Sequence, residues 1–221
     1  MQAIILCGGQ ATRLGKIAKH TPKILLEVNG QTVLENQIAL LKDAGIDEVI
    51  LATGHLHNEI YEVARGCYNG VKIRYSYESV PLGTGGAVKQ AFQFVDEFPV
   101  VILDGDNVYE GFTLKKMIEA FKNDTDGLIL AQYVSDVRDF GHLRLSVTGE
   151  ILCFDEKPVI PVPGFVNAGV VILNPVVMPH QQNFSLAKDV FPHLRLRVHL
   201  QSGMRWTDIG TIERLFRARG D

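Results

Sequence analysis

Residues 3–14 of the chain read AIILCGGQATRL, an apolar run that ends in a pair of glycines. The branched apolar residues indicate a buried strand. The run from Ala3 to Cys7 is only five residues long and has no basic leader, so we do not expect a signal peptide. A glycine-rich loop after such a strand can point backbone N–H groups at phosphates. The alternative is a plain glycine turn with a solvated Arg13.

Strand-like and helix-like segments alternate through the first half of the chain. An apolar stripe over residues 32–44 predicts a helix, with Thr32 and Glu35 as a capping box. Further strands are predicted at 48–53, 71–77 and 99–103, with helices at 58–65 and 84–95 between them. This order is typical of βαβ units, which build a mostly parallel, doubly wound sheet.

The second half has short strands without long helices between them. They are predicted at 128–133, 142–147, 151–154 and 165–173, before a last helix at 211–219. We therefore expect an α/β fold, a Rossmann-like doubly wound, mostly parallel sheet with an antiparallel extension. No flexible linker interrupts the chain, so residues 1–221 are expected to form one domain with two halves, 1–110 and 111–221.

Composition excludes several classes of function. The 22 basic and 25 acidic residues give a net charge of −3, which predicts no nucleic acid or membrane partner. No apolar run approaches the length of a membrane span. The three cysteines, at 7, 67 and 153, are too few and too widely spaced for a disulfide framework. We expect reduced thiols in a cytoplasmic protein.

Two acidic motifs lie where segments end. LDGDN at 103–107 follows a predicted strand, and Asp208 stands in WTDIGT at 206–211, before the last helix. Carboxylates at such positions can hold Mg²⁺ beside a phosphate, because Mg²⁺ takes one or two protein carboxylates and completes its shell with phosphate and water. The alternative is that Asp106 and Asp208 only cap a turn and a helix.

Two further segments offer ligand contacts. PLGTGGA at 81–87 could bring backbone close to a flat base, with Glu78 just before it. DEKP at 155–158 offers Lys157 for a substrate phosphate, and Glu156 and Asn167 for hydroxyls. The alternatives are a surface ion pair and an ordinary strand asparagine. An NAD site is not expected, because the first loop lacks the Gly-x-Gly-x-x-Gly order.

Seven motifs together resemble one enzyme family. GGQATRL, TPK, PLGTGGA, LDGDN, DEKP, FVNAGV and WTDIGT are similar, in family order between residues 3 and 218, to the sugar-1-phosphate nucleotidylyltransferases. The resemblance implies an enzyme that joins a nucleoside triphosphate to a sugar 1-phosphate and releases pyrophosphate. The PLGTGGA form is most similar to the guanylyltransferases of heptose and mannose 1-phosphate, so GTP is the expected nucleotide.

The resemblance also implies roles for individual residues. Residues 1–110 would bind nucleotide and 111–221 the sugar phosphate. The catalytic residues would be Arg13, Lys23, Asp106 and Asp208, with Mg²⁺ held by the two aspartates. The nucleotide would contact Leu6, Gly8, Gly9, Thr12, Arg13, Lys23, Glu78, Gly83, Thr84 and Asp106. The sugar phosphate would contact Gly141, Glu156, Lys157 and Asn167.

Some features favour alternatives. The family usually has glycine where this chain has Ala11, and a positive φ there would cost alanine roughly 1 kcal/mol. GDNVYEG at 105–111 is more similar to thymidylyltransferases, so a thymidylyl-, uridylyl- or cytidylyltransferase stays open. A non-catalytic regulatory subunit that binds sugar nucleotides is a further alternative. We expect exposed apolar residues near 175–195, which could serve a homodimer.

Overall fold

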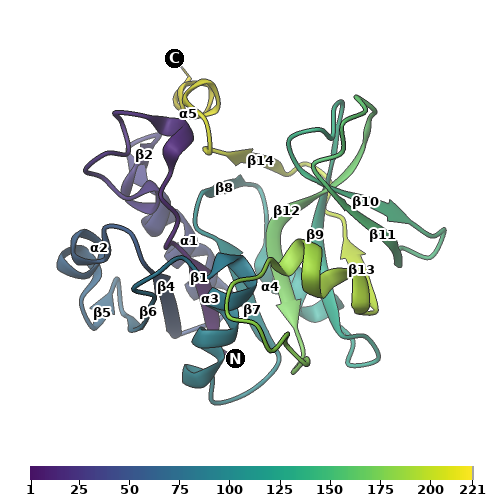
Figure 1. The fold of residues 1–221 in the computed structure, drawn as a ribbon, viewed down its shortest axis with the longest axis horizontal. Coiled ribbons are helices and arrows are strands. Elements are labelled where there is room, and N and C mark those ends of the chain that lie inside the picture. Colours follow the sequence, from purple (N-terminus) through teal and green to yellow (C-terminus); the bar gives the residue numbers. More distant parts are fainter. Residues whose placement is uncertain (221) are drawn as a thin grey trace.

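A sheet of ten strands forms the centre of the protein, seen here in a computed structural model that describes residues 1–220 (Figure 1). The parallel part is confirmed. β1 (Ala3–Leu6) lies parallel between β4 (Glu48–Thr53) and β7 (Val100–Asp104), and β6 (Val71–Tyr77) lies parallel beside β4. The carboxyl ends of these strands therefore meet at one edge of the sheet, where Leu6 stands opposite Asp104.

The antiparallel extension is also confirmed. β12 (Gly164–Leu173) runs antiparallel to β7 and to β9 (Gly127–Val134). β10 (Gly141–Leu145) lies between β12 and β11 (Ile151–Glu156), antiparallel to both. These strands project as a second lobe from the parallel half (Figure 1). A break in the β12–β9 register after Asn167 turns the start of β12 toward that lobe.

The predicted helices of the first half are present as α1 (Val33–Asp43), α2 (His57–Ala64) and α3 (Gly83–Ala91). The capping box at the start of α1 is confirmed. The Glu35 N–H donates to Thr32 Oγ1 at 3.1 Å, and the Thr32 N–H donates to Glu35 Oε2 at 2.7 Å. Two orphan N–H groups at the helix start are thereby satisfied.

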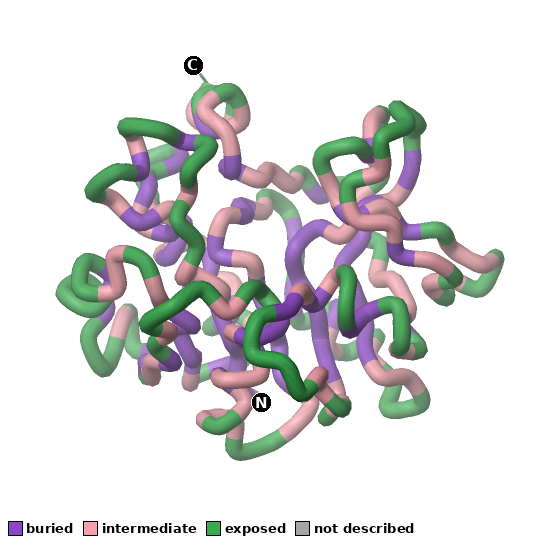
Figure 2. The backbone as a smooth tube through the Cα atoms, viewed as in Figure 1, coloured by how far each residue is buried: buried purple, intermediate pink, exposed green. Residues whose placement is uncertain are grey.

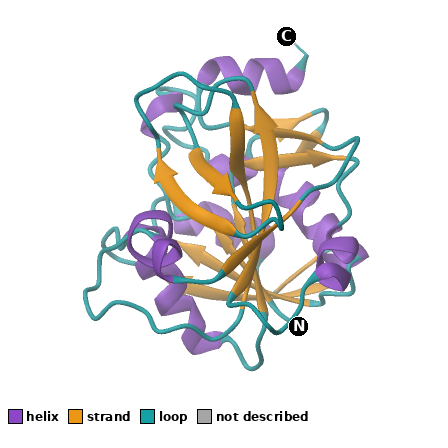
Figure 3. Ribbon diagram, turned by 90° about the vertical axis from the view of Figure 1, so that its right-hand side faces the viewer, coloured by secondary structure: helices purple, strands orange, loops and turns teal. Residues whose placement is uncertain are grey.

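Both faces of the sheet are covered, and Figure 3 shows helices on both sides of the strands. Side chains of β1 alternate between two buried clusters, as the period of a strand requires. Ile5 packs with Leu34 of α1 in the first cluster, and Ile4 packs with Val88 of α3 in the second. A strand buried on both faces reads as a continuous apolar run, which is why residues 3–6 could be recognised.

Several short elements had no clear sequence pattern. Among them are α4 (Leu114–Ala120) and β13 (Leu196–His199), which lies parallel to β9. β8 (Asn107–Glu110) pairs antiparallel with β14 (Arg205–Asp208) in a separate sheet of two strands. Small pairs β2 (Glu27–Val28) with β3 (Gln31–Thr32), and β5 (Cys67–Tyr68) with β6, complete the strands. α5 (Ile212–Arg219) ends the chain as predicted.

The buried residues are concentrated along the central sheet, as Figure 2 shows. The expectation of exposed apolar residues near 175–195 is wrong for most of that segment. Phe184, Leu186 and Phe191 are buried in the second cluster, and Val177 is the large apolar residue that stands exposed there. Among residues 1–220, no helix is long and apolar enough to cross a membrane.

Candidate functional site

A cavity of about 650 Å³ opens at the carboxyl ends of β1 and β7, between the two lobes. It brings together every residue that the sequence predicts for the site. The first half of the chain contributes Leu6, Gly8, Gly9, Thr12, Arg13, Lys23, Glu78, Gly83, Thr84 and Asp106. The second half contributes Gly141, Glu156, Lys157, Asn167 and Asp208.

The loop after β1 folds back over the cavity. Ala11 adopts the left-handed conformation, with φ 52° and ψ 33°, so the positive φ that its place in the motif suggested is present. A short 3₁₀ turn, Thr12–Leu14, follows, and the buried Leu14 anchors it. This turn presents the exposed Arg13, whose Nη2 lies 3.2 Å from where a Cβ on Gly210 would stand. Arg13 therefore reaches the segment that carries Asp208.

Glu78 lies against the glycine backbone at the other end of the loop. Its Oε1 lies 2.9 Å from where a Cβ on Gly8 would stand and 3.0 Å from that of Gly54, so the carboxylate lies close against both glycines. Its Oε2 accepts a hydrogen bond from the Leu82 N–H at 3.2 Å. Burial raises the pKa of Glu78, while that hydrogen bond lowers it. A half-buried carboxylate thus lies at the place where the sequence analysis predicts the nucleotide base.

The glycines of residues 81–87 have a second role. Added Cβ atoms on Gly85 and Gly86 would stand 2.3 Å from the Phe184 ring and 2.1 Å from the Gln182 carbonyl oxygen. The Leu186 N–H donates to Thr84 Oγ1 at 3.0 Å. The start of α3 is therefore packed under residues 182–186, and these two glycines allow that contact.

The acidic end of the cavity is built by β7, β8 and β14. Lys23 Nζ lies 2.7 Å from Asp106 Oδ2, with both side chains mostly buried. The Ile209 N–H donates to the Asp106 carbonyl at 2.9 Å, which holds the turns of Asp106 and Asp208 side by side. The fully buried Gln37 donates from Nε2 to the carbonyls of Asp104 and Asn107, at 2.8 and 3.0 Å.

Asp104 is a cavity residue that the sequence analysis did not select. Burial, together with the charges of Asp106, Asp208 and Glu156, raises its pKa to about 8, against an opposing effect of Lys23. Its position could have indicated it, because Asp104 is the last residue of β7. The carboxyl ends of the parallel strands lie together at the cavity.

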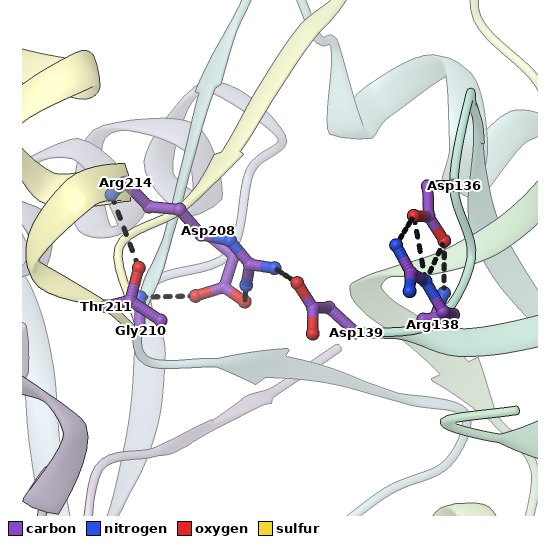
Figure 4. Close-up of polar contacts among 7 residues, drawn as sticks. All are labelled: Asp136, Arg138, Asp139, Asp208, Gly210, Thr211 and Arg214. Atoms are coloured by element: carbon purple, nitrogen blue, oxygen red, sulfur yellow. Dashed lines mark hydrogen bonds and ion pairs between the residues drawn. The ribbon is translucent and has the colours of Figure 1, made fainter. Parts of the chain in front are cut away.

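Asp208 is held by two donors. Its Oδ2 accepts from Arg214 Nη1 at 2.7 Å, and its Oδ1 accepts from the Gly210 N–H. The pKa of Asp208 is raised by burial and by Asp106, while Arg214 lowers it. Figure 4 shows Arg214 between Asp208 and Asp139. Residues 1–220 hold no group of three or more His, Cys, Asp and Glu side chains arranged for a metal, so a cation here would rely on this pair of aspartates.

The residues that the sequence analysis predicts for the sugar phosphate lie on β10, β11 and β12 or directly after β11. Gly141 pairs with Glu156 across the β10–β11 ladder, and a Cβ on Gly141 would stand 3.0 Å from Glu156 Oε2. Lys157 adopts φ 52°, and its Nζ lies 3.7 Å from Glu156 Oε1. Asn167 uses its Oδ1 to accept the Gly169 N–H at 2.9 Å, which leaves its amide hydrogens for a ligand.

Comparisons with known proteins agree on one family. The family model described as nucleotidyl transferase matches residues 2–221. The D-glycero-alpha-D-manno-heptose 1-phosphate guanylyltransferase of Campylobacter jejuni is 35% identical over 78% of this chain and 76% of its own length. The mannose-1-phosphate guanyltransferase of Yarrowia lipolytica is 31% identical over 95% of this chain and 61% of its own.

Solved structures give the same result for the fold. HddC from Yersinia pseudotuberculosis, complexed with GMP-PN, superposes with a TM-score of 0.84 at 27% identity, and the match covers 99% of this chain and 98% of that one. The expected fold class is thus confirmed by an independent structure.

Proposed function

The chain belongs to the nucleotidyl transferase family, and on that premise we propose that it transfers GMP from GTP to a sugar 1-phosphate of the heptose or mannose type. The products are a GDP-sugar and pyrophosphate. The names of its relatives support guanine and these two sugar classes. The three unpaired cysteines support the proposal that it works in the cytoplasm.

The observation that carries the proposal is the composition of the cavity of about 650 Å³ at the carboxyl ends of β1 and β7. One side offers the loop after β1 and Glu78, and the other offers Glu156, Lys157 and Asn167. Two substrates that must react with each other need adjoining sites, because holding both in line converts a bimolecular step into an effectively unimolecular one. The acidic pair Asp106 and Asp208 stands with Lys23 and Arg13 in the same cavity.

The proposed step is an in-line displacement. An anionic oxygen of the sugar phosphate attacks the α-phosphorus of GTP, a new P–O bond forms, and the bond to the β-phosphate oxygen breaks. The electron pair leaves with pyrophosphate. The attacking oxygen is already anionic at pH 7, so this chain needs no general base. Its residues instead align the two phosphates and neutralise their charge.

The residues divide by position. Arg13 at the tip of the glycine loop holds the leaving phosphates, and Lys23 stands beside Asp106 near the α-phosphate. Lys157 holds the sugar phosphate, and Glu156 and Asn167 bind sugar hydroxyls. Guanine lies over Gly8, with Leu6, Gly83 and Thr84 beside it, and Glu78 accepts its N1–H and N2–H₂ groups.

We include Mg²⁺ in the proposal, held by Asp106 and Asp208. Their turns are joined by the Ile209–Asp106 hydrogen bond, and the charge of Asp106 raises the pKa of Asp208. Paired carboxylates that face a phosphate loop fit the preference of Mg²⁺ for oxygen ligands. When bound, the ion would supply charge neutralisation on the phosphates.

A pyrophosphate-release screen tests the proposal. The four triphosphates GTP, dTTP, UTP and CTP are crossed with a panel of sugar 1-phosphates that includes heptose and mannose, and products are resolved by mass. GTP with heptose 1-phosphate or mannose 1-phosphate should give the highest rate. A dominant dTDP-sugar would contradict the guanine assignment alone, and no release from any pair would contradict the proposed function.

A further inference from the structure

Arg214 connects the acidic end of the cavity to its sugar side. It projects from α5, and its side chain is only 15% exposed. Nη1 donates to Asp208 Oδ2 and Nη2 donates to Asp139 Oδ2, both at 2.7 Å. One planar guanidinium therefore bridges two carboxylates that stand 69 positions apart in the chain, on β14 and on the loop between β9 and β10 (Figure 4).

The contact continues into the sugar side. The Arg214 Cζ lies 4.6 Å from the centre of the Phe140 ring, which is a cation–π distance. The Phe140 carbonyl accepts the Lys157 N–H at 2.9 Å, and the next residue, Gly141, pairs with Glu156. The loop that Arg214 holds is thus bonded directly to Lys157 and Glu156, two of the three side chains assigned to the sugar phosphate and its hydroxyls.

Trp206 lies beside Phe140, in the same group of contacts as Arg214. Its ring centre is 5.1 Å from that of Phe140, and its Nε1 donates to Asn107 Oδ1 at 2.8 Å. It is the one tryptophan of the chain. Its fluorescence therefore reports on the corner where Arg214, Phe140 and the Asp106–Asn107 turn meet.

We propose that Arg214 is a positioning residue that couples the sugar-phosphate side of the cavity to Asp208, with Asp139 and Phe140 as its second anchor. Arg214 holds the carboxylate of Asp208 and the loop of residues 139–141 in one geometry. Lys157 is therefore already in position when the sugar phosphate binds. The inference rests on the proposed function, since it concerns the same cavity and the same two substrates.

The geometry favours arginine over lysine for this role. A guanidinium presents several N–H donors in a fixed plane, so it can serve two carboxylates and still stack on an aromatic ring. A lysine ammonium is a compact charge, and it would keep one carboxylate at a time. Arg214→Lys therefore keeps a positive charge beside Asp208 but loses the bridge to the loop of residues 139–141.

The test compares two aspartates of the same loop. Asp139→Asn removes the second anchor of Arg214. Asp136→Asn removes an exposed ion pair of similar length, Asp136–Arg138 at 2.6 Å, which does not contact Arg214 (Figure 4). Both changes remove one charge from an exposed or half-exposed side chain, so neither should affect folding strongly. Thermal unfolding checks that both variants keep the stability of the wild type.

Three measurements are made on each variant. KM for mannose 1-phosphate and kcat come from pyrophosphate release with saturating GTP and Mg²⁺. GTP affinity comes from calorimetry without sugar, and the dissociation constant of mannose 1-phosphate comes from Trp206 fluorescence without turnover. Asp139→Asn should raise the sugar-phosphate KM and dissociation constant by about three- to ten-fold, with GTP affinity unchanged. Asp136→Asn should match the wild type.

A double-mutant cycle tests whether Asp139 acts through Arg214. If it does, Arg214→Lys with Asp139→Asn should be no worse for the sugar-phosphate KM than the more damaging single variant. Fold-losses in KM that multiply would mean that Asp139 acts independently of Arg214 and would overturn the inference. Equal effects of Asp139→Asn and Asp136→Asn would do the same. A wild type inactive on every sugar 1-phosphate would overturn the proposed function first, whereas an active wild type with equal variants overturns only this inference.

Discussion

Lys23 Nζ and Asp106 Oδ2 lie 2.7 Å apart, which joins the segment after the glycine loop to the turn after β7. The two side chains are only 19% and 26% exposed, so the pair is shielded from bulk water on most sides. In the proposed reaction each group would exchange partners when the phosphates enter. Lys23 would turn to a phosphate oxygen, and Asp106 would turn to a cation.

Asp106→Asn should lower kcat by at least about a hundred-fold while the fold survives. The amide keeps the size of the carboxylate but loses the charge that a divalent cation requires. Pyrophosphate release measures kcat, and circular dichroism checks the fold. Removal of divalent metal with EDTA should stop turnover of the wild type, and full activity in EDTA would exclude the metal role.

Asp208→Asn should behave like Asp106→Asn, and the double variant should be little worse than either alone, because both residues are proposed to hold one ion. Losses that multiply would indicate that the two aspartates act in separate steps. Arg214 stays beside residue 208 in this variant, and its contact with Asp139 should keep the corner folded.

Arg13→Ala and Lys157→Ala should separate the two substrates. Arg13 stands on the glycine loop near Gly210, whereas Lys157 stands beyond β11 beside Glu156. Arg13→Ala should weaken GTP binding in calorimetry by about ten-fold, as expected for the loss of a charge-assisted contact. Lys157→Ala should leave GTP affinity nearly unchanged and raise the sugar-phosphate KM. Equal losses of GTP affinity would show that the nucleotide is placed wrongly.

GTP affinity should depend on the ionisation of Glu78. Burial raises the pKa of Glu78, and in the proposed complex the carboxylate must be charged to accept two N–H groups of guanine. Affinity should therefore fall as the pH is lowered through that raised pKa, and Glu78→Gln should remove this part of the pH dependence. Calorimetry measures the GTP affinity of the wild type and of Glu78→Gln at a series of pH values. Titration of the GTP phosphates affects both proteins equally, so the difference between them isolates the contribution of Glu78.

Gly86→Ala should destabilise the protein by roughly 1–3 kcal/mol. A Cβ there would stand 2.1 Å from the Gln182 carbonyl oxygen and 2.7 Å from the Leu82 Cβ, and neither atom is the flexible end of a side chain that could move away. Gly66→Ala is the matched control, because a Cβ at Gly66 meets nothing within 4 Å. Urea unfolding of the two variants measures the difference. Equal stabilities would show that residues 182–186 do not press on α3.

Strong local signals explain why much of the fold could be predicted. Residues 3–6 are apolar on both faces because both faces are covered, and the Thr32–Glu35 pair fits a capping box that the structure contains. The motif residues of the site lie at strand ends and in loops, and parallel strands bring their carboxyl ends to one edge. Their convergence follows from the topology.

Other residues could not be found in this way, because their role depends on pairing between distant segments. Arg214 reads as an ordinary charged residue of an amphipathic helix, and its partner Asp139 comes close only through the β8–β14 pair and the β9–β10 loop. Strands of four residues such as β13 and β14 carry too little alternation to be recognised. Gly85 and Gly86 read as room for a ligand, whereas the structure also uses them for packing.

Ala11→Gly should stabilise the protein by roughly 0.5–1 kcal/mol. An L-residue in the left-handed conformation costs about 1–2 kcal/mol, and glycine avoids that cost while it makes the unfolded chain more flexible by a smaller amount. Ala44→Gly is the control, because Ala44 has φ −85° and carries no left-handed strain. Glycine at position 44 only makes the unfolded chain more flexible, so the free energy of unfolding should fall. Urea unfolding of both variants gives the two signs. A loss of stability in both would mean that the loop does not hold Ala11 at positive φ in solution. If the loop keeps its path, Ala11→Gly should also leave the KM for GTP near that of the wild type, since the N–H groups of residues 8–13 would point the same way.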